Sequence, residues 1–504
     1  MSTTSSQPTV AIAGGGLAGL AAACALSDAG FHVALFEKRP FLGGRASSYE
    51  HPGTGEVVDN CQHVLFRVCT NLVKFYERIG VANQIRWFDQ MNFIEPGGRV
   101  SVMKSSPLPA PLHTAPSFLH FPFLNAADKL AITRALVPLT LTIQRDRGKS
   151  FQQWLDEHGQ TRNAVARFWH PILISALSEE LDRLSVSAAA QVVRESMKTP
   201  IARHMGVPTL PLTDLYNAAG DYIRSHGGEL HFRCPIDGFT VDPTQVRVGT
   251  KGSSQGIASQ RVFDYLLIAL PFDALNSILP NDDLSNPLRE QITHFENSPI
   301  TGIHLWFDRQ ISDLDHAVLL DRTIQWMFHK SRLQPMRTQS KQDREGRDLN
   351  RAAADENGVP QVSPHLQDLG SATAGGSYIE LVVSSSKALI NKSRAEIVEL
   401  ALSEVREFFP AAREANLLKS TVIKEINATY SPRPGIDAHR PTAVTRWARV
   451  FLAGDWTATG WPATMEGAVR SGYLAAEALS RSMGIHRTFL EPDLPASGLM
   501  RLFG

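Results

Sequence analysis

The fold of this chain is decided by residues 9–40, TVAIAGGGLAGLAAACALSDAGFHVALFEKRP. The β-branched run Thr9–Ala13 meets three glycines, and the small-residue segment Leu17–Ala29 follows them with helical spacing. Phe31–Phe36 is a second apolar run with the character of a buried strand. The stretch therefore predicts a β-α-β unit in an α/β fold.

The glycines of this unit have the spacing Gly14-x-Gly16-x-x-Gly19. Gly14 permits a tight turn, Gly16 lets the backbone approach a pyrophosphate, and Gly19 lets helix and strand pack closely. Glu37, at the end of the second strand, can accept hydrogen bonds from both ribose hydroxyls. We interpret the turn as a dinucleotide site rather than an accidental glycine turn. Its predicted binding residues are Gly14, Gly16, Leu17, Ala18, Gly19, Glu37 and Lys38.

Two further signals favour FAD over NAD. Gly43-Gly44-Arg45 can place a guanidinium beside the pyrophosphate, although a solvated loop arginine is the simpler alternative. Gly454-Asp455 follows a buried strand and can set a carboxylate against the ribityl hydroxyls, although an Asp helix cap is again the alternative. Since no cysteine lies near this C-terminal motif, we expect FAD to be bound non-covalently.

The composition of the whole chain narrows the class of protein. Its 504 residues predict two closely packed domains. Fifty Lys and Arg residues balance fifty Asp and Glu residues, which argues against a nucleic-acid partner. The four cysteines have neither zinc-site nor disulfide spacing, so we expect no metal and a cytoplasmic protein. The N-terminus lacks a signal-peptide pattern, and no segment has the length and apolarity of a membrane span, so any membrane contact is peripheral, at the inner face.

The order of predicted elements suggests a Rossmann-like nucleotide domain that two other units interrupt. We expect the nucleotide domain at residues 1–100, 206–280 and 436–504, a helical and apolar insert at 101–205, and a mixed-sheet substrate domain at 281–435. The polar, charged stretch 337–369 is interpreted as a mobile excursion of the substrate domain. The remaining strands are expected at 229–249, 262–270, 300–308, 323–328, 378–384 and 450–453, and helices at 71–79, 393–409 and up to 479.

The insert begins with an apolar tract, Ser105–Leu124, that holds five prolines. The prolines exclude a regular helix, and the tract is too apolar for a solvated linker, so it is a candidate lid or membrane-facing entrance. Helical patterns follow over Asn125–Ile143, with Asn125 as a cap, and over Phe151–Leu184. Candidate walls of an apolar channel, each of which could instead be core, are Leu112, Phe118, Phe121, Phe123, Phe168, Trp169, Trp306 and Trp326.

Motifs near both ends of the chain resemble the flavin amine oxidase and phytoene desaturase superfamily. They are Leu42–Arg45, Phe451–Asp455 and Met465–Gly472. The resemblance implies a flavin amine oxidase type of fold. It also implies that Pro235 and Ile236 supply backbone contacts to the adenine and that Met465 lines the isoalloxazine.

Finer motifs are similar to the hydroxysqualene dehydroxylase group of hopanoid biosynthesis. They are Asp59–His63, Phe168–Pro171, Gln325–Phe328, Ala428-Thr429 and Gly460–Thr464. The group's implied reaction removes the hydroxyl of hydroxysqualene reductively and gives squalene, with reduced flavin as hydride donor. The implied partners are a hydrophobic isoprenoid substrate, transient contact with a membrane, and squalene or phytoene synthase-like enzymes.

The same resemblance places the segment after Arg45 beside the flavin. Asp59, Gln62 and His63 are then candidates for proton transfer, and we choose His63 with Gln62 because an imidazole titrates near neutral pH. A satisfied structural histidine is the alternative reading of His63.

Other functions remain open at this point. A carotenoid desaturase would run similar chemistry oxidatively, and a flavin amine oxidase would need an aromatic cage where Trp461–Thr464 stands. A flavin-free lipid chaperone conflicts with the intact glycine, glutamate and arginine signatures, and a simple NAD dehydrogenase leaves Gly454-Asp455 unexplained. No second Gly-x-Gly-x-x-Gly unit for NADPH is found, so the electron source is undetermined.

Overall fold

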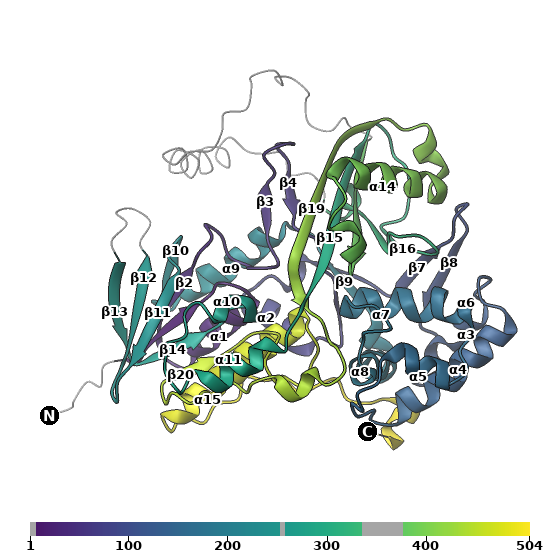
Figure 1. Ribbon diagram of the computed structural model, residues 1–504. Helices are drawn as coiled ribbons and strands as arrows, with labels where there is room; N and C mark the ends of the chain where they lie inside the picture. Colours follow the sequence, from purple (N-terminus) through teal and green to yellow (C-terminus); the bar gives the residue numbers. More distant parts are fainter. Residues whose placement is uncertain (1–6, 252–257, 335–375, 504) are drawn as a thin grey trace.

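The computed structural model describes residues 7–251, 258–334 and 376–503 (Figure 1). The predicted excursion 337–369 lies outside the described residues. Two large sheets and a group of helices make up the described chain.

The first large sheet has five strands, all parallel, in the order β10-β2-β1-β14-β20. Their bounds are Thr9–Ala13 (β1), His32–Glu37 (β2), Glu229–Phe232 (β10), Tyr265–Ile268 (β14) and Val450–Leu452 (β20). Three distant stretches of sequence therefore build one sheet, and the α/β fold predicted from the β-α-β unit is confirmed. The carboxyl ends of these strands are where parallel sheets bind nucleotides.

Two helices cover the glycine turn of this sheet. Helix α1 (Leu17–Asp28) is buried along almost its whole length because Ala, Gly and Leu occupy all its sides. Helix α15 (Met465–Ser482) crosses it so closely that a Cβ on Gly472 would lie 2.3 Å from the Ala18 carbonyl oxygen. Helix α9 (Leu212–Ser225) also contacts α1.

The second large sheet has seven strands in the order β19-β15-β18-β17-β16-β7-β8, and only the β16–β7 pair is parallel. Helix α14 (Arg394–Phe408), which the Ser393 and Glu396 capping box begins as predicted, packs on it. The strands are β7 (Gln90–Ile94), β8 (Val100–Lys104), β15 (Asn297–Phe307), β16 (His316–Leu319), β17 (Trp326–His329), β18 (Ser377–Ser384) and β19 (Leu417–Tyr430).

This sheet differs from the sequence prediction in two ways. Strand β7 lies within the segment 1–100 that we assigned to the nucleotide domain, yet it pairs with β16 and β8 of the substrate sheet. The long strand β19 escaped prediction because its buried residues do not alternate along the strand. The domain boundaries themselves stay predictions.

The helical insert lies beside the substrate sheet, at the end of the molecule away from the β10 edge (Figure 1). Asn125 caps α4 with Asp128 in a capping box, as the sequence indicated. The proline-rich tract does contain a short helix, α3, contrary to the prediction. Pro116 is compatible with it because it lies in the first turn, where a backbone N–H would have no partner within the helix. The elements are η2 (Leu112–Thr114), α3 (Ala115–Leu119), α4 (Ala126–Leu141), α5 (Phe151–Glu157), α6 (Arg162–Ala164), the π-helical turn η3 (Val165–Trp169), α7 (His170–Leu177), α8 (Val186–Met197) and η4 (Pro200–Arg203).

Smaller elements join these units. The strands are β3 (Ser48–Glu50), β4 (Val57–Asp59), β5 (Leu65–Phe66), β6 (Ile85–Phe88), β9 (Met205–Pro208), β11 (Ile236–Val241), β12 (Val246–Lys251) and β13 (Ala258–Phe263). The helices are α2 (Thr70–Arg78), α10 (Phe272–Leu275), α11 (Asn286–Thr293), α12 (Lys330–Leu333), η7 (Ile436–His439) and η8 (Gly498–Leu502). Among the described residues, no helix combines the length and apolarity needed to cross a membrane.

Candidate active site

One large cavity of about 860 Å³ joins the glycine turn to the helical insert. Among its lining residues are all of those that the sequence predicted for cofactor binding except Gly19, together with the chosen proton-transfer pair, Gln62 and His63. These are Gly14, Gly16, Leu17, Ala18, Glu37, Lys38, Gly44, Arg45, Gln62, His63, Ile236, Gly454, Asp455 and Met465. The exception, Gly19, lies behind the turn, and a Cβ there would stand 1.9 Å from the Gly14 carbonyl oxygen.

The glycine turn has the shape that a pyrophosphate needs. Gly14 has φ +108°, a conformation that side chains rarely adopt. A Cβ on Gly16 would have only the Gly44 Cα within 4 Å, at 3.8 Å, so this position borders open space. Helix α1 begins at Gly16 without a side-chain cap, which leaves its N-terminal dipole directed to the cavity. The residues present therefore fit the phosphates of FAD.

Glu37, the last residue of strand β2, is held in place by two backbone N–H groups. Its Oε2 accepts a hydrogen bond from the Gly15 N–H at 2.7 Å, and its Oε1 accepts one from the Arg39 N–H at 2.8 Å. Pro235 also lines the cavity, next to Ile236. This corner can receive the adenosine half of the cofactor, as the sequence predicted.

The two distant flavin signatures meet in the cavity wall. Arg45 Nη2 lies 2.5 Å from Asp455 Oδ1, and Arg45 Nη1 donates to the Ala428 carbonyl oxygen at 3.2 Å. Asp455 is buried, and Met465, at the start of α15, lines the same wall. The fold thus brings residues 410 positions apart into one ion pair beside the expected flavin.

Beyond this polar end the cavity is apolar. Leu112, Phe118, Phe168, Trp169 and Trp326 line it, as the sequence suggested. The prediction was wrong for Phe121 and Phe123, which stack on each other within the core, and for Trp306, which stacks on Tyr378.

Several wall residues had no distinguishing signal in the sequence. They come from α7, α8 and the substrate sheet, and only the fold brings their apolar side chains to one space. They include Ile172, Val192, Val193, Ile300 and Val382.

Gln62 and His63 both line the cavity, in the segment that follows the flavin motif at Arg45. The His63 Nδ1 lies 2.7 Å from the Cys61 carbonyl oxygen, to which it donates its proton. Within the described chain, His63 Nε2 has no hydrogen-bond partner. Burial lowers the pKa of His63 below its usual value, so the ring is neutral at pH 7 and Nε2 is a proton acceptor.

A buried charge cluster behind Gln62 was not foreseen. Lys330 Nζ lies 2.6 Å from Asp59 Oδ2, 2.9 Å from Gln62 Oε1 and 3.4 Å from Glu380 Oε2. Burial opposes ionisation of Asp59, but Lys330 holds its pKa below the usual value, so Asp59 is a fixed counter-ion. It is absent from the described lining of the cavity. The hydrogen bond from Lys330 to Gln62 Oε1 positions the Gln62 amide, and Lys330 itself is not part of the described cavity wall.

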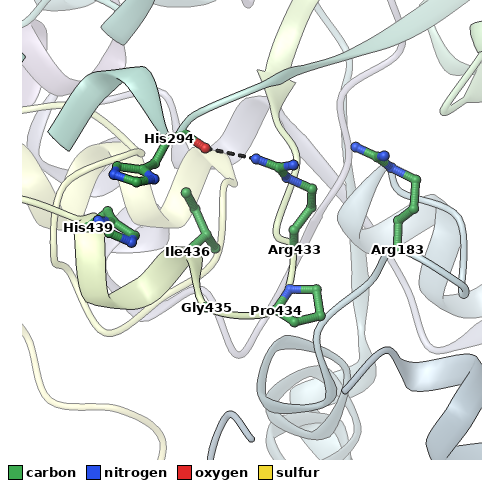
Figure 2. A pocket seen from close by; sticks show the side chains of 7 residues that line it. All are labelled: Arg183, His294, Arg433, Pro434, Gly435, Ile436 and His439. Atoms are coloured by element: carbon green, nitrogen blue, oxygen red, sulfur yellow. Dashed lines mark hydrogen bonds between the residues drawn. The ribbon is translucent and has the colours of Figure 1, made fainter. Parts of the chain in front are cut away.

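A second, smaller hollow of about 360 Å³ lies between α11 and the loop before η7 (Figure 2). Arg183 and Arg433 line it, but both guanidiniums are paired with Glu296, and Arg433 donates to the His294 carbonyl oxygen at 2.8 Å. None of the flavin signatures borders this hollow in the described part of the chain. We therefore place the active site in the large cavity.

The glycine turn, the buried Glu37 and the apolar extension of the cavity are the features expected of a flavoprotein oxidoreductase. A family model for flavin containing amine oxidoreductases matches residues 17–480, and the chain belongs to this family. FAD is its cofactor.

Two cyanobacterial desaturases are among the proteins that the chain resembles over nearly its full length. The chain is similar to a 15-cis-phytoene desaturase of Synechococcus elongatus, with 26% identity over 93% of this chain and 95% of the relative. It is similar to a probable zeta-carotene desaturase of the same organism, with 27% identity over 94% and 99%.

Solved structures agree in fold. An oxidoreductase from Methanosarcina mazei superposes with a TM-score of 0.65 at 15% identity, over 92% of this chain and 99% of that one. Putrescine oxidase with bound putrescine gives a TM-score of 0.64 at 15% identity, over 95% and 99%. At this identity the two likenesses concern the fold alone.

Proposed function

We propose that this chain is a FAD-dependent oxidoreductase that exchanges a hydride with a carbon atom of a long isoprenoid chain. The observation that carries the proposal is the single cavity, with flavin-binding residues at one end and Phe, Trp, Leu, Val and Ile side chains at the other. A hydrocarbon chain gains free energy when such walls remove it from water, roughly 0.8 kcal/mol per buried CH₂.

The first candidate reaction is carbon–carbon desaturation. Eight proteins that are 24–27% identical to this chain are phytoene or zeta-carotene desaturases. Bound FAD supplies the hydride acceptor for this chemistry. The neighbouring carbon must lose a proton, and the free Nε2 of neutral His63 is an acceptor in the cavity wall.

The second candidate is reductive dehydroxylation of hydroxysqualene to squalene. It is supported by the motifs around Gln62, Trp169, Trp326 and Trp461, all of which contribute to the cavity wall. The leaving hydroxyl would need a proton, and because burial lowers the pKa of His63, its ring is mostly neutral at pH 7 and carries no imidazolium proton to donate. The desaturase reading therefore has the stronger support.

Paired anaerobic incubations test both reactions. In the first, protein with oxidised flavin receives phytoene or zeta-carotene, and desaturation bleaches the flavin band while a more conjugated product accumulates. In the second, photoreduced protein receives hydroxysqualene, and dehydroxylation restores the flavin band while squalene accumulates. If the flavin band changes with none of these substrates, in protein that retains its flavin, the isoprenoid proposal is wrong.

The role of His63 is tested by His63→Ala and His63→Gln. We expect both to retain the flavin spectrum and to lower kcat by roughly 10²–10⁴, the usual contribution of a positioned acid or base. Because its pKa is lowered, base activity should persist below pH 6.5 and fall only at more acidic pH. Full turnover in the alanine variant would assign His63 a structural role.

A further inference from the structure

One part of the large cavity wall lies where three segments of the chain meet. Met103 of β8, Thr114 of η2 and Arg203 of η4 all line the cavity. A hydrogen bond from Ser105 Oγ to the Pro200 carbonyl oxygen, at 3.5 Å, joins the residues after β8 to η4. The residues near these three in sequence that also line the cavity are Pro111, Leu112, Ala115, Phe118 and Ala202. A polar group in this part of the wall is therefore set among apolar ones.

Arg203 places a guanidinium in this apolar wall. Within the described chain, its Nη2 contacts the sulfur of Met103, and no carboxylate forms an ion pair with it. A thioether is a weak acceptor and carries no charge. Burial lowers the pKa of Arg203 to about 10, so the side chain is still a cation at pH 7. Because buried charges in proteins are normally paired, this cation is suited to an anionic ligand.

The other charged groups of the cavity wall have partners or face solvent. Glu195 pairs with Lys198 at 2.9 Å, and Lys38 is exposed. The lining residues that pair or hydrogen-bond within the protein are Glu37, Arg39, Arg45, Glu425, Asp455 and Glu466. Arg203 is therefore the cation of the described cavity wall that is neither paired nor exposed.

Two polar side chains of η2 lie beside this cation. Thr114 lines the cavity, and its hydroxyl makes no hydrogen bond in the part of the chain that the structure describes. His113 is fully buried, and neither of its ring nitrogens has a partner among the described residues. Burial and the Arg203 charge lower the pKa of His113 to about 4, so its ring is neutral and adds no second cation. A guanidinium and a free hydroxyl are donors that suit an anionic oxygen group.

We propose that Arg203 and Thr114 bind the anionic head of a single-chain lipid, a carboxylate or a phosphate, while its chain lies along the apolar walls. The planar guanidinium can donate two parallel N–H groups to two oxygens of such a head. The chain adds apolar burial that a free inorganic anion lacks. Binding of this lipid does not rest on the proposed function, whereas its competition with an isoprenoid substrate does.

Calorimetric titration of the FAD-loaded protein tests the site, with each lipid kept below its critical micelle concentration. The anionic probes are farnesyl phosphate and dodecanoate, and farnesol and dodecanol are their neutral counterparts. We expect Arg203→Met to lower affinity for the anionic probes roughly ten- to a hundredfold, and to change affinity for the alcohols little. Since the two anionic probes share the kind of head and differ in the chain, the tighter one identifies an isoprenoid or a fatty ligand.

Arg134→Met is the matched control. Arg134 is an exposed cation of α4 in the same insert, outside the described cavity lining and without an ion pair among the described residues. Its substitution removes the same charge and should leave all four affinities unchanged. An equal loss in this control, or an equal loss for anionic and neutral probes in Arg203→Met, would overturn the proposal.

Stability separates a ligand-binding arginine from a structural one. Arg203→Met should melt at the same temperature as the unmodified protein or higher, because it removes a buried charge that has no partner. A lower melting temperature together with unchanged affinity for the anionic probes would assign Arg203 a structural role. Arg203→Lys keeps the charge without the planar fork and should bind the anionic probes with intermediate affinity, which tests the site even if Arg203→Met does not fold.

Failure of this site can be told apart from failure of the proposed function. If both are correct, farnesyl phosphate raises the KM for an isoprenoid hydrocarbon without changing kcat, and it does so less in Arg203→Met. Arg203-dependent binding in a protein that turns over no isoprenoid would retain the anion site and reject the proposed function. Turnover without any Arg203-dependent binding would retain the function and reject the site.

Discussion

At the scale of single residues, two glycines of the same turn are needed for different reasons: Gly19 for packing and Gly16 for access to the cavity. A Cβ on Gly19 would collide with the Gly14 carbonyl oxygen at 1.9 Å, whereas one on Gly16 would extend towards the cavity. We predict that Gly19→Ala destabilises the fold by more than the ~1–3 kcal/mol typical of overpacked cores. Gly16→Ala should keep its melting temperature without flavin and lose FAD affinity.

The measurements are the thermal midpoint of flavin-free protein and a titration with FAD. Each variant is the control for the other because both replace the same residue type within one turn. Normal FAD binding by Gly16→Ala would contradict the assignment of this position to the pyrophosphate.

The buried carboxyl of Glu380 predicts a pH dependence of stability. Burial raises its pKa from 4.5 to about 8 despite the Lys330 ammonium at 3.4 Å. Between these two values the folded state binds a proton that the unfolded state releases, so stability falls as pH rises through this window. Glu380→Gln removes this titration and should therefore raise the free energy of unfolding. The gain over the unmodified protein should grow by up to ~1.4 kcal/mol for each pH unit between 4.5 and about 8.

Melting temperatures of both proteins from pH 5 to pH 9 measure this difference. We expect the two curves to diverge up to about pH 8 and to run parallel above it. Glu399→Gln, on the exposed side of α14, removes a carboxylate without burial and is the control. Curves that stay parallel throughout would show that Glu380 titrates normally.

At the scale of elements, the apolar walls should limit the length of chain that the cavity holds. Ile172, on α7, lines the cavity and is half-buried. We predict that Ile172→Trp fills part of the channel and lowers turnover of a long isoprenoid at least tenfold, while the flavin spectrum is unchanged. Leu418→Trp, on the exposed side of β19, should leave turnover unaltered.

Turnover of substrates of graded chain length checks this prediction. The loss should shrink as the substrate is shortened, because a shorter chain does not reach the added ring. An equal loss at every length would place Ile172 outside the substrate path.

The elements also explain what the sequence could predict. The strand at Thr9–Ala13 and the glycine turn that follows it were predictable because local spacing and backbone freedom define them. So were the caps Asn125 and Ser393, which act within three residues. Arg45 and Asp455 could each be assigned to a FAD site from their own motifs, but their contact spans 410 positions and only the fold shows it.

What the sequence missed depends on tertiary packing. Lys330 follows a buried strand and carries no local sign that Asp59 and Glu380 will surround it. Strand β19 lacks alternation because it lies between several layers along its length. Phe121 and Trp306 are as apolar as Phe118 and Trp326, so only the fold decides which of them reaches the cavity.

At the scale of the whole molecule, the cofactor connects parts of the chain that are far apart in sequence. The predicted FAD contacts lie at residues 14–45, at 235–236 and at 454–465, and all of them except Gly19 border one cavity. A ligand that binds only the folded state stabilises it by ~2.7 kcal/mol at a concentration one hundred times its Kd. Binding of FAD should therefore hold the three segments together.

We predict that deflavinated protein melts at a lower temperature and that added FAD raises the midpoint progressively with its concentration. FMN should raise it much less, because it lacks the adenosine half that Glu37, Pro235 and Ile236 are placed to receive. Glu37→Gln tests this corner alone: it should weaken the response to FAD and leave the small response to FMN unchanged. Equal responses to FAD and FMN would mean that the glycine turn of β1 and α1 does not hold the nucleotide, and the flavin would then have to be held by the Arg45 and Asp455 end of the cavity alone.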